Sequence, residues 1–201
     1  MRIAQEKLDS AKKNSKRAKA LETGDFATAF EDVCIVGDSI VEAIEGFGIL
    51  DNNEVVAKIG GTTYDLADSV DEVAAINPKY IVLHYGNNQI SSKENAEGFL
   101  KLYLAEINKL RQKLPNAKIY IESIFPVGPS APATDSYLNN IDYYNQKIKK
   151  MCADNKLAYI DCDKLWNGLN NTYYDGDDIH PTYSFYTDKY LPFLAKELGL
   201  V

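Results

Sequence analysis

Residues Val33–Val41, VCIVGDSIV, decide which fold this chain can adopt. The apolar run Val33–Val36 leads into Gly37-Asp38-Ser39 and then into a segment that reads as the start of a helix. This order places the Ser39 hydroxyl at the carboxyl end of a buried strand, beside the free N–H groups of a helix N-terminus. Ligands and substrates collect at this place in open α/β sheets.

The same alternation of apolar runs and helical stretches continues along the chain. Continuous apolar strands separated by helices predict a mostly parallel sheet that is covered on both faces. We therefore expect an α/β fold, a three-layer α/β/α sandwich around a five-stranded sheet. The expected strands are Val33–Val36, Val55–Ile59, Tyr80–Tyr85, Lys118–Ile124 and Ala158–Ile160, and the expected longer helices are 63–75, 94–113, 136–155 and 183–198.

Composition excludes several classes of protein. The length of 201 residues fits one domain, and the formal charge of −7 argues against a nucleic-acid partner. The chain contains no transmembrane segment, because no apolar run approaches the roughly 20 residues that span a bilayer. The three cysteines do not form a disulfide framework. Cys34 is interpreted as a small buried hydrophobic residue. Cys152 and Cys162 are expected to be unbridged, and a disulfide between them is the alternative in an oxidising compartment. A glycosylation sequon begins at Asn170.

The first 28 residues differ from the rest. Residues 1–22 hold seven Lys/Arg against three acids, without a strong apolar stripe. We interpret 1–28 as a helical leader and 29–201 as the folded domain that carries the candidate site. The leader is expected to be a solvated helix, with a basic membrane-facing helix as the sharper alternative. Its role and the oligomeric state stay open, and an extracytoplasmic or cell-surface location is favoured over a cytoplasmic one.

A serine, a histidine and an aspartate suggest nucleophilic acyl chemistry. His180 lies three residues after Asp177, so a turn can bring the carboxylate to one ring nitrogen while the other faces Ser39. The alternatives are a helix cap for Ser39 and a structural role for His180. Asp175 and Asp178 are competing carboxylates, interpreted as solvated or turn-forming.

Polar residues also follow the second and third strands. Gly61 and Asn88 have the chemistry of an oxyanion hole, with the Ser39 backbone N–H as a third donor. Taken singly, both read as turn residues, and Gly60 competes with Gly61. His84 is interpreted as a core or rim histidine rather than a second base, because its preceding neighbours are apolar.

These segments, Gly37-Asp38-Ser39, Gly61, Gly86-x-Asn88 and Asp177-x-x-His180, resemble in order the four sequence blocks of the SGNH or GDSL hydrolases. The resemblance spans residues 33–181. It implies a flavodoxin-like sandwich and a metal-free serine hydrolase without a cofactor. It also implies Ser39 as nucleophile, His180 as base, Asp177 as its orienter, and Gly61 and Asn88 as oxyanion donors. Ile40 and Gln89 depart from the family pattern, which usually has leucine and aspartate there.

The expected function is a serine esterase that hydrolyses small acyl esters, above all acetyl esters, on a small-molecule or glycan substrate. An O-acyltransferase using the same serine and a non-catalytic glycan-binding module are the alternatives. Residues 125–140 are expected to wall the site. Four aromatic side chains could stack on a sugar ring or could simply lie at a loop-rich surface: Tyr137, Trp166, Tyr173 and Tyr174.

Overall fold

The computed structural model describes residues 2–166 and 171–201. Within these residues five strands form one sheet in the order β2-β1-β3-β4-β5, and every neighbouring pair is parallel. This is the flavodoxin-like strand order. The expected α/β/α sandwich is confirmed, with a wholly parallel sheet. The strands are β1 Val33–Gly37, β2 Val55–Ala57, β3 Tyr80–His84, β4 Lys118–Glu122 and β5 Ala158–Ile160.

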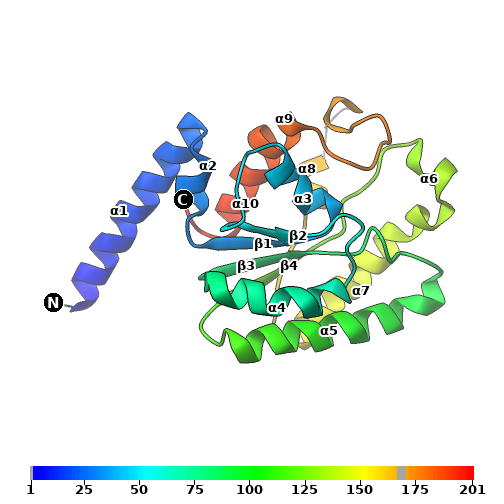
Figure 1. Cartoon of the computed structure of the whole chain (residues 1–201), viewed down its shortest axis with the longest axis horizontal. Coiled ribbons are helices and arrows are strands. Elements are labelled where there is room, and N and C mark those ends of the chain that lie inside the picture. The colour runs from blue at the N-terminus through cyan, green and yellow to red at the C-terminus, as the bar shows by residue number, and fades with distance from the viewer. Residues whose placement is uncertain (1, 167–170) are drawn as a thin grey trace.

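Helices cover both faces of the sheet (Figure 1). One face carries α4 Asp65–Ile76, α5 Ala96–Lys113 and α7 Ile141–Asp154. The other carries α2 Phe26–Phe30, α3 Ser39–Gly46 and a C-terminal helix made of α9 Tyr183–Phe185, the π-helical η4 Tyr186–Tyr190 and α10 Leu191–Glu197. The shorter elements are α6 Ala131–Thr134, α8 Asp163–Trp166, η1 Lys93–Asn95, η2 Ser136–Asn140 and η3 Asn171–Tyr173.

Strand β1 shows why its sequence is continuously apolar. Cys34 and Val36 pack into the core between the sheet and α4, α5 and α7, whereas Val33 and Ile35 pack into the core on the opposite face. A strand that is buried on both faces has no position for a polar side chain until it reaches the edge of the sheet. The first polar side chains after β1 therefore mark the place where the chain reaches that edge.

The expected elements differ from the observed ones mainly at their ends. Strand β2 stops at Ala57, because Lys58 and Ile59 leave the sheet and Ile59 is 72% exposed. The helix expected at 136–155 begins as the 3-10 turn η2. The Asp135 carboxylate caps this turn, because its Oδ1 accepts the Tyr137 N–H at 2.9 Å.

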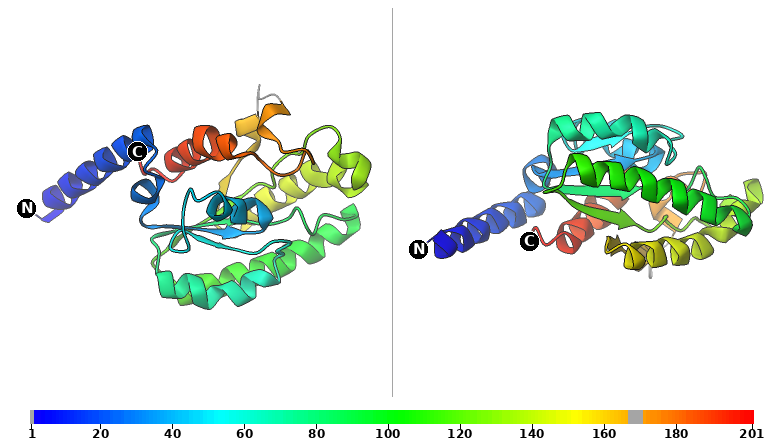
Figure 2. Two further views of the ribbon diagram at one scale, coloured as in Figure 1. Left: turned by 45° about the horizontal axis from the view of Figure 1, so that its top comes forward. Right: turned by 90° about the horizontal axis from the view of Figure 1, so that it is seen from below.

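Helix α1, Arg2–Thr23, projects from the end of the molecule where the strands begin (Figures 1 and 2). Its last turns are anchored, because Arg17 is buried and donates to Asp32 at 3.1 Å and Ala20 is buried in the core. The boundary expected at residue 28 falls inside α2, whose Phe26 and Phe30 are core residues. The division into leader and domain stays a prediction.

All three cysteines are buried free thiols. The interpretation of Cys34 as a buried hydrophobe is confirmed, and the alternative Cys152–Cys162 bridge is not formed. Asn170 of the sequon lies outside the described residues. Among the helices described, none combines the length and apolarity that a bilayer crossing requires.

The close packing at the end of β1 gives a stability prediction. A Cβ atom at Gly37 would lie 2.5 Å from the His84 carbonyl oxygen and 2.5 Å from Val41 Cγ2. Gly37→Ala should therefore lower the free energy of unfolding by about 1–3 kcal/mol, measured by urea denaturation. Gly98→Ala, in α5 with open space around it, is the control and should raise it by up to about 1 kcal/mol. Equal effects of the two changes would contradict the packing argument.

Candidate active site

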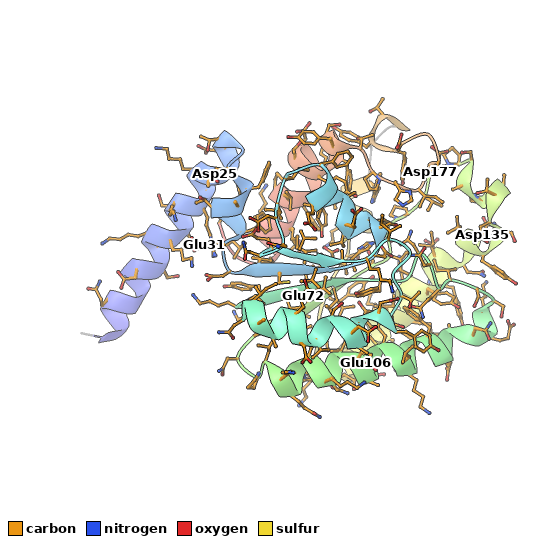
Figure 3. The ribbon with its side chains drawn as sticks, viewed as in Figure 1. Asp25, Glu31, Glu72, Glu106, Asp135 and Asp177 are labelled. Atoms are coloured by element: carbon orange, nitrogen blue, oxygen red, sulfur yellow. The ribbon has the colours of Figure 1, made fainter. Side chains whose placement is uncertain are left out.

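The segments that follow β1, β2 and β3 meet the loop 175–182 at the carboxyl edge of the sheet. Parallel strands all end on one side, so residues far apart in sequence converge there. Figure 3 shows Asp177 in the loop before α9, at the end of the molecule opposite α1. The proposed catalytic side chains are thus remote from the projecting helix.

Ser39 is the first residue of α3, but it does not cap that helix. The cap is Asp38, whose Oδ1 accepts the Ile40 N–H at 3.0 Å. The Ser39 hydroxyl instead faces His180, with 2.9 Å between Oγ and Nε2. The alternative role of Ser39 as a helix cap is therefore wrong, because the Asp38 carboxylate caps α3 and the Ser39 hydroxyl is not needed for capping.

Asp177 holds His180 through both the backbone and the ring. Its Oδ1 accepts the N–H groups of Ile179 and His180, each at 2.9 Å, and its Oδ2 lies 2.6 Å from His180 Nδ1. Burial raises the pKa of the Asp177 carboxyl, but the hydrogen bonds from His180 and Ile179 outweigh it and hold the pKa below its ordinary value. An ionised Asp177 can orient the imidazole and stabilise it when it gains a proton.

The neighbouring carboxylates take other roles. Asp178 has a left-handed backbone, φ 58°, and its Oδ2 accepts the N–H and the hydroxyl of Ser130 at 2.9 and 2.6 Å. Its carbonyl accepts the Gly128 N–H at 2.6 Å. Asp178 therefore joins the loop after β4 to the loop 175–182, which we call the histidine loop. Asp175 caps its own turn, accepting the Gly176 N–H at 2.8 Å. The interpretation of Asp178 as merely solvated or turn-forming missed this link between two loops.

Gly60 and Gly61 differ in what they allow. Gly60 has φ 70° and open space where a Cβ would lie, so it shapes the turn. A Cβ at Gly61 would lie 2.8 Å from the Lys58 carbonyl oxygen and 3.3 Å from Asp38 Cα, so Gly61 is the residue that packs against the serine segment. Its N–H donates to Lys58 O at 2.8 Å. Gly61 therefore lies beside the segment that holds Ser39, but in this conformation its N–H is already paired.

Asn88 and Gln89 connect the loop after β3 to the loop after β2. Asn88 is exposed, and its Nδ2 donates to the Gly61 carbonyl at 3.0 Å. Gln89, which departs from the family pattern, accepts the Thr63 N–H at 2.6 Å. Among the described residues, the Ser39 N–H has no hydrogen-bond acceptor, as befits the first residue of a helix. The Ser39 N–H and the second N–H of Asn88 are thus the donors best able to meet an oxyanion.

Asp65 stabilises the loop that contains Gly61 through hydrogen bonds. Its Oδ2 accepts the N–H and the hydroxyl of Thr62, both at 2.8 Å, and its Oδ1 pairs with Lys58. The Lys58 hydrogen bond, followed by those from Thr62, lowers the pKa of Asp65 to about 2. An aspartate at the first position of a helix is the local sequence signal for this role.

The aromatic side chains near the site do not all remain available to a substrate. Trp166 lies between Tyr174, with ring centroids 4.5 Å apart, and Phe185, 4.4 Å apart, both stacked. Both of its ring faces are covered, so of the two alternatives for Trp166, stacking on a sugar is not open to it in this conformation. The Tyr174 hydroxyl donates to Pro126 O at 2.9 Å. Of the four aromatic candidates, Tyr137 is the one that is largely exposed.

Comparison with known proteins gives a consistent result. The model of the GDSL-like lipase/acylhydrolase family matches residues 35–187. A platelet-activating factor acetylhydrolase IB subunit beta homolog from Drosophila melanogaster is 34% identical over 109 residues, 48% of this chain and 46% of that protein. The match thus spans slightly less than half of that curated relative.

Two solved structures share the fold. A GDSL-like lipase from Bacteroides thetaiotaomicron is 17% identical with a TM-score of 0.61, over 84% of this chain and 86% of that one. A carbohydrate esterase family 3 protein from Talaromyces cellulolyticus is 20% identical with a TM-score of 0.57, over 83% and 93% of the two chains.

The hydrogen bonds and the ion pair of Asp65 predict that the stability of the fold depends on pH. A carboxyl whose pKa is lower in the folded state stabilises the fold above its unfolded pKa, and this contribution is lost as the pH falls through the folded pKa. Asp65→Asn should cost about 1–2 kcal/mol of unfolding free energy at pH 7. The difference from wild type should shrink as the pH falls from about 4 towards 2. Urea denaturation at several pH values measures it, with the exposed Asp68→Asn as control. A difference that does not depend on pH would contradict it.

The two adjacent carboxylates of the histidine loop give a matched pair for reactivity. Asp177→Asn should slow labelling of Ser39 by a fluorophosphonate about 10²- to 10⁴-fold, because the amide favours the wrong imidazole tautomer. Asp178→Asn changes a carboxylate that faces Ser130 instead of His180 and should slow labelling less than about tenfold. Labelling is followed by intact-protein mass spectrometry. The assignment of Asp177 fails if the two variants label equally fast.

Proposed function

The chain belongs to the GDSL-like lipase/acylhydrolase family, and on that basis we propose that it is a serine esterase that removes small acyl groups, acetyl first among them. The supporting observation is the hydrogen-bonded series in which Ser39 Oγ lies 2.9 Å from His180 Nε2 and His180 Nδ1 lies 2.6 Å from Asp177. In the proposal Ser39 is the nucleophile, His180 the general base and acid, and Asp177 its orienter.

Acylation begins when His180 Nε2 takes the Ser39 proton. Oγ then attacks the ester carbonyl, and the negative charge moves to the carbonyl oxygen, where the Ser39 N–H and the Asn88 amide donate to it. Gly61 would add its N–H only if that group turned away from Lys58 O. Asp177 stabilises the imidazolium meanwhile.

Collapse of this intermediate breaks the ester C–O bond. His180 returns the proton to the leaving alcohol, and the acyl group stays on Ser39. Water then gives a proton to His180 and attacks the acyl carbon, after which the proton returns to Ser39 Oγ. The products are a carboxylic acid and an alcohol, and the enzyme is regenerated without a cofactor.

The openness of the site supports a short acyl group on a bulky alcohol. The side chains of His180 and Asp177 are 39% and 47% exposed. An acetyl group needs little enclosure, whereas a long acyl chain requires an apolar channel to leave water. The relatives named acetylhydrolase and carbohydrate esterase support an acetylated carbohydrate as the first substrate to test.

Acyl transfer by the same serine is the second candidate, because an exposed site admits an acceptor alcohol as easily as water. Incubation with sugar alcohols distinguishes the two: transfer yields acylated acceptor, and hydrolysis yields free acid. A non-catalytic glycan-binding module is disfavoured by the 2.9 Å contact between Ser39 and His180, since a pure binder does not need it.

Ester hydrolysis by Ser39→Ala tests the proposal directly. We expect kcat to fall about 10⁴- to 10⁶-fold with the thermal unfolding midpoint nearly unchanged. The wild-type protein should cleave acetyl esters, including acetylated xylan fragments, at least about tenfold faster than esters with long acyl chains. The proposal is refuted by undiminished turnover in Ser39→Ala, and its acyl preference by faster cleavage of the long-chain esters.

A further inference from the structure

A group of buried polar side chains lies at the carboxyl end of β1, β3 and β4, next to the start of α3. Asp38, His84 and Glu122 are 0%, 1% and 1% exposed. Strand pairing sets His84 opposite Gly37, the residue before Asp38. Charged side chains are almost never fully buried unless they are paired, so this group needs a physical account that the ester-cleaving residues do not supply.

Hydrogen bonds connect the group from one side. His84 Nδ1 lies 3.0 Å from Glu122 Oε2, and the Tyr190 hydroxyl donates to the same oxygen at 3.1 Å. On the other side, Asp38 Oδ1 accepts the Ile40 N–H of α3, while Asp38 Oδ2 and His84 Nε2 have no hydrogen-bond partner within the described part of the chain. Asp38 is therefore tied to the nucleophile's helix by one oxygen and is left uncompensated at the other.

Charge compensates what hydrogen bonds do not. Burial lowers the pKa of His84, but the hydrogen bond to Glu122 and the charge of Asp38 raise it by more. Burial raises the pKa of the Asp38 carboxyl above its ordinary value, and the charge of His84, followed by the hydrogen bond from the Ile40 N–H, opposes that rise. A positive imidazolium between two carboxylates is the arrangement in which all three buried groups are stabilised.

The other titratable groups around the cluster do not change this balance. Burial raises the pKa of each of them, so all stay neutral near pH 7: Tyr85 beside Asp38, Tyr103 from α5, Cys162 after β5, and Tyr186 and Tyr190 from the C-terminal helix. The charges that act inside the cluster are then those of Asp38, His84 and Glu122.

We propose that His84 is a positioning residue for the nucleophile: held as an imidazolium by Glu122, it keeps Asp38 ionised, so that Asp38 caps α3 and holds Ser39 at the start of that helix. This rests on the proposed esterase function of Ser39. A carboxylate at a helix N-terminus binds the free N–H groups better than a neutral carboxyl does. Loss of the imidazolium would thus loosen the first turn of α3, in which Ser39 lies.

The wild-type protein gives the first test. The chain has two histidines, so ¹⁵N-histidine NMR resolves both, and the signal that moves when Ser39 is phosphonylated is that of His180. The His84 ring should carry protons on both nitrogens at pH 7, where an ordinary histidine is mostly neutral. A neutral His84 ring at pH 7 overturns the proposal, whether or not any ester is cleaved.

Glu122→Gln gives the second test, because it keeps a hydrogen-bond acceptor for Nδ1 and removes the charge. His84 should become neutral in this variant. The kcat and the rate of Ser39 labelling by a fluorophosphonate should fall about tenfold while KM stays the same. Tyr103→Phe is the control: it removes a buried hydroxyl without a hydrogen-bond partner among the described residues, and it should leave kcat, labelling and the His84 signal unchanged.

The outcomes separate the two proposals. A wild-type protein that cleaves no ester refutes the esterase, while the charge of His84 and the labelling rate still test the positioning role. A Glu122→Gln protein with neutral His84 but undiminished labelling overturns that role. If Glu122→Gln does not fold, Glu122→Asp replaces it: the shorter carboxylate should keep His84 charged and retain more labelling than His84→Gln, and equal loss in both overturns the proposal.

Discussion

The contact between Gly37 and His84 controls how closely β1 and β3 approach at the edge where the reactive groups gather. The two residues are paired in register, and the space at Gly37 has no room for a Cβ beside the His84 carbonyl. The segments that directly follow the two strands are held at a distance that depends on this spacing. Asp38 and Ser39 follow from β1, and the loop that holds Asn88 follows from β3, so the position of Ser39 relative to Asn88 depends on one glycine.

Much of the architecture could be predicted, because a strand that is buried on both faces has a nearly continuous apolar sequence. Strands β1, β3, β4 and β5 lie where such runs lie, and parallel pairing then brings Ser39, Asp177 and His180 to one edge. The ends were harder: β2 stops before Lys58 because the chain must turn at Gly60, and α2 is core although it follows a basic helix.

Side-chain partnerships were the part that sequence could not supply. Nothing local to Asp178 indicates that it binds Ser130, a residue 48 positions away. Likewise, the covering of Trp166 by Tyr174 and Phe185 depends on three segments that meet only in the folded chain. Glu122 offered one such signal: it is the last residue of β4, directly after the apolar residues 119–121, and a buried charge in such a place needs a partner.

Ser39 and His180 are 141 positions apart, and this distance has a kinetic consequence. Parallel strands cannot pair through a short hairpin, so each pairing must first close a long loop, which makes such sheets slow to form. During synthesis the serine is made well before the imidazole, and for that interval its hydroxyl is an ordinary alcohol. If Ser39 has the role that we propose, it becomes reactive only when the loop that holds His180 reaches the sheet edge, and until then the growing chain carries no activated serine.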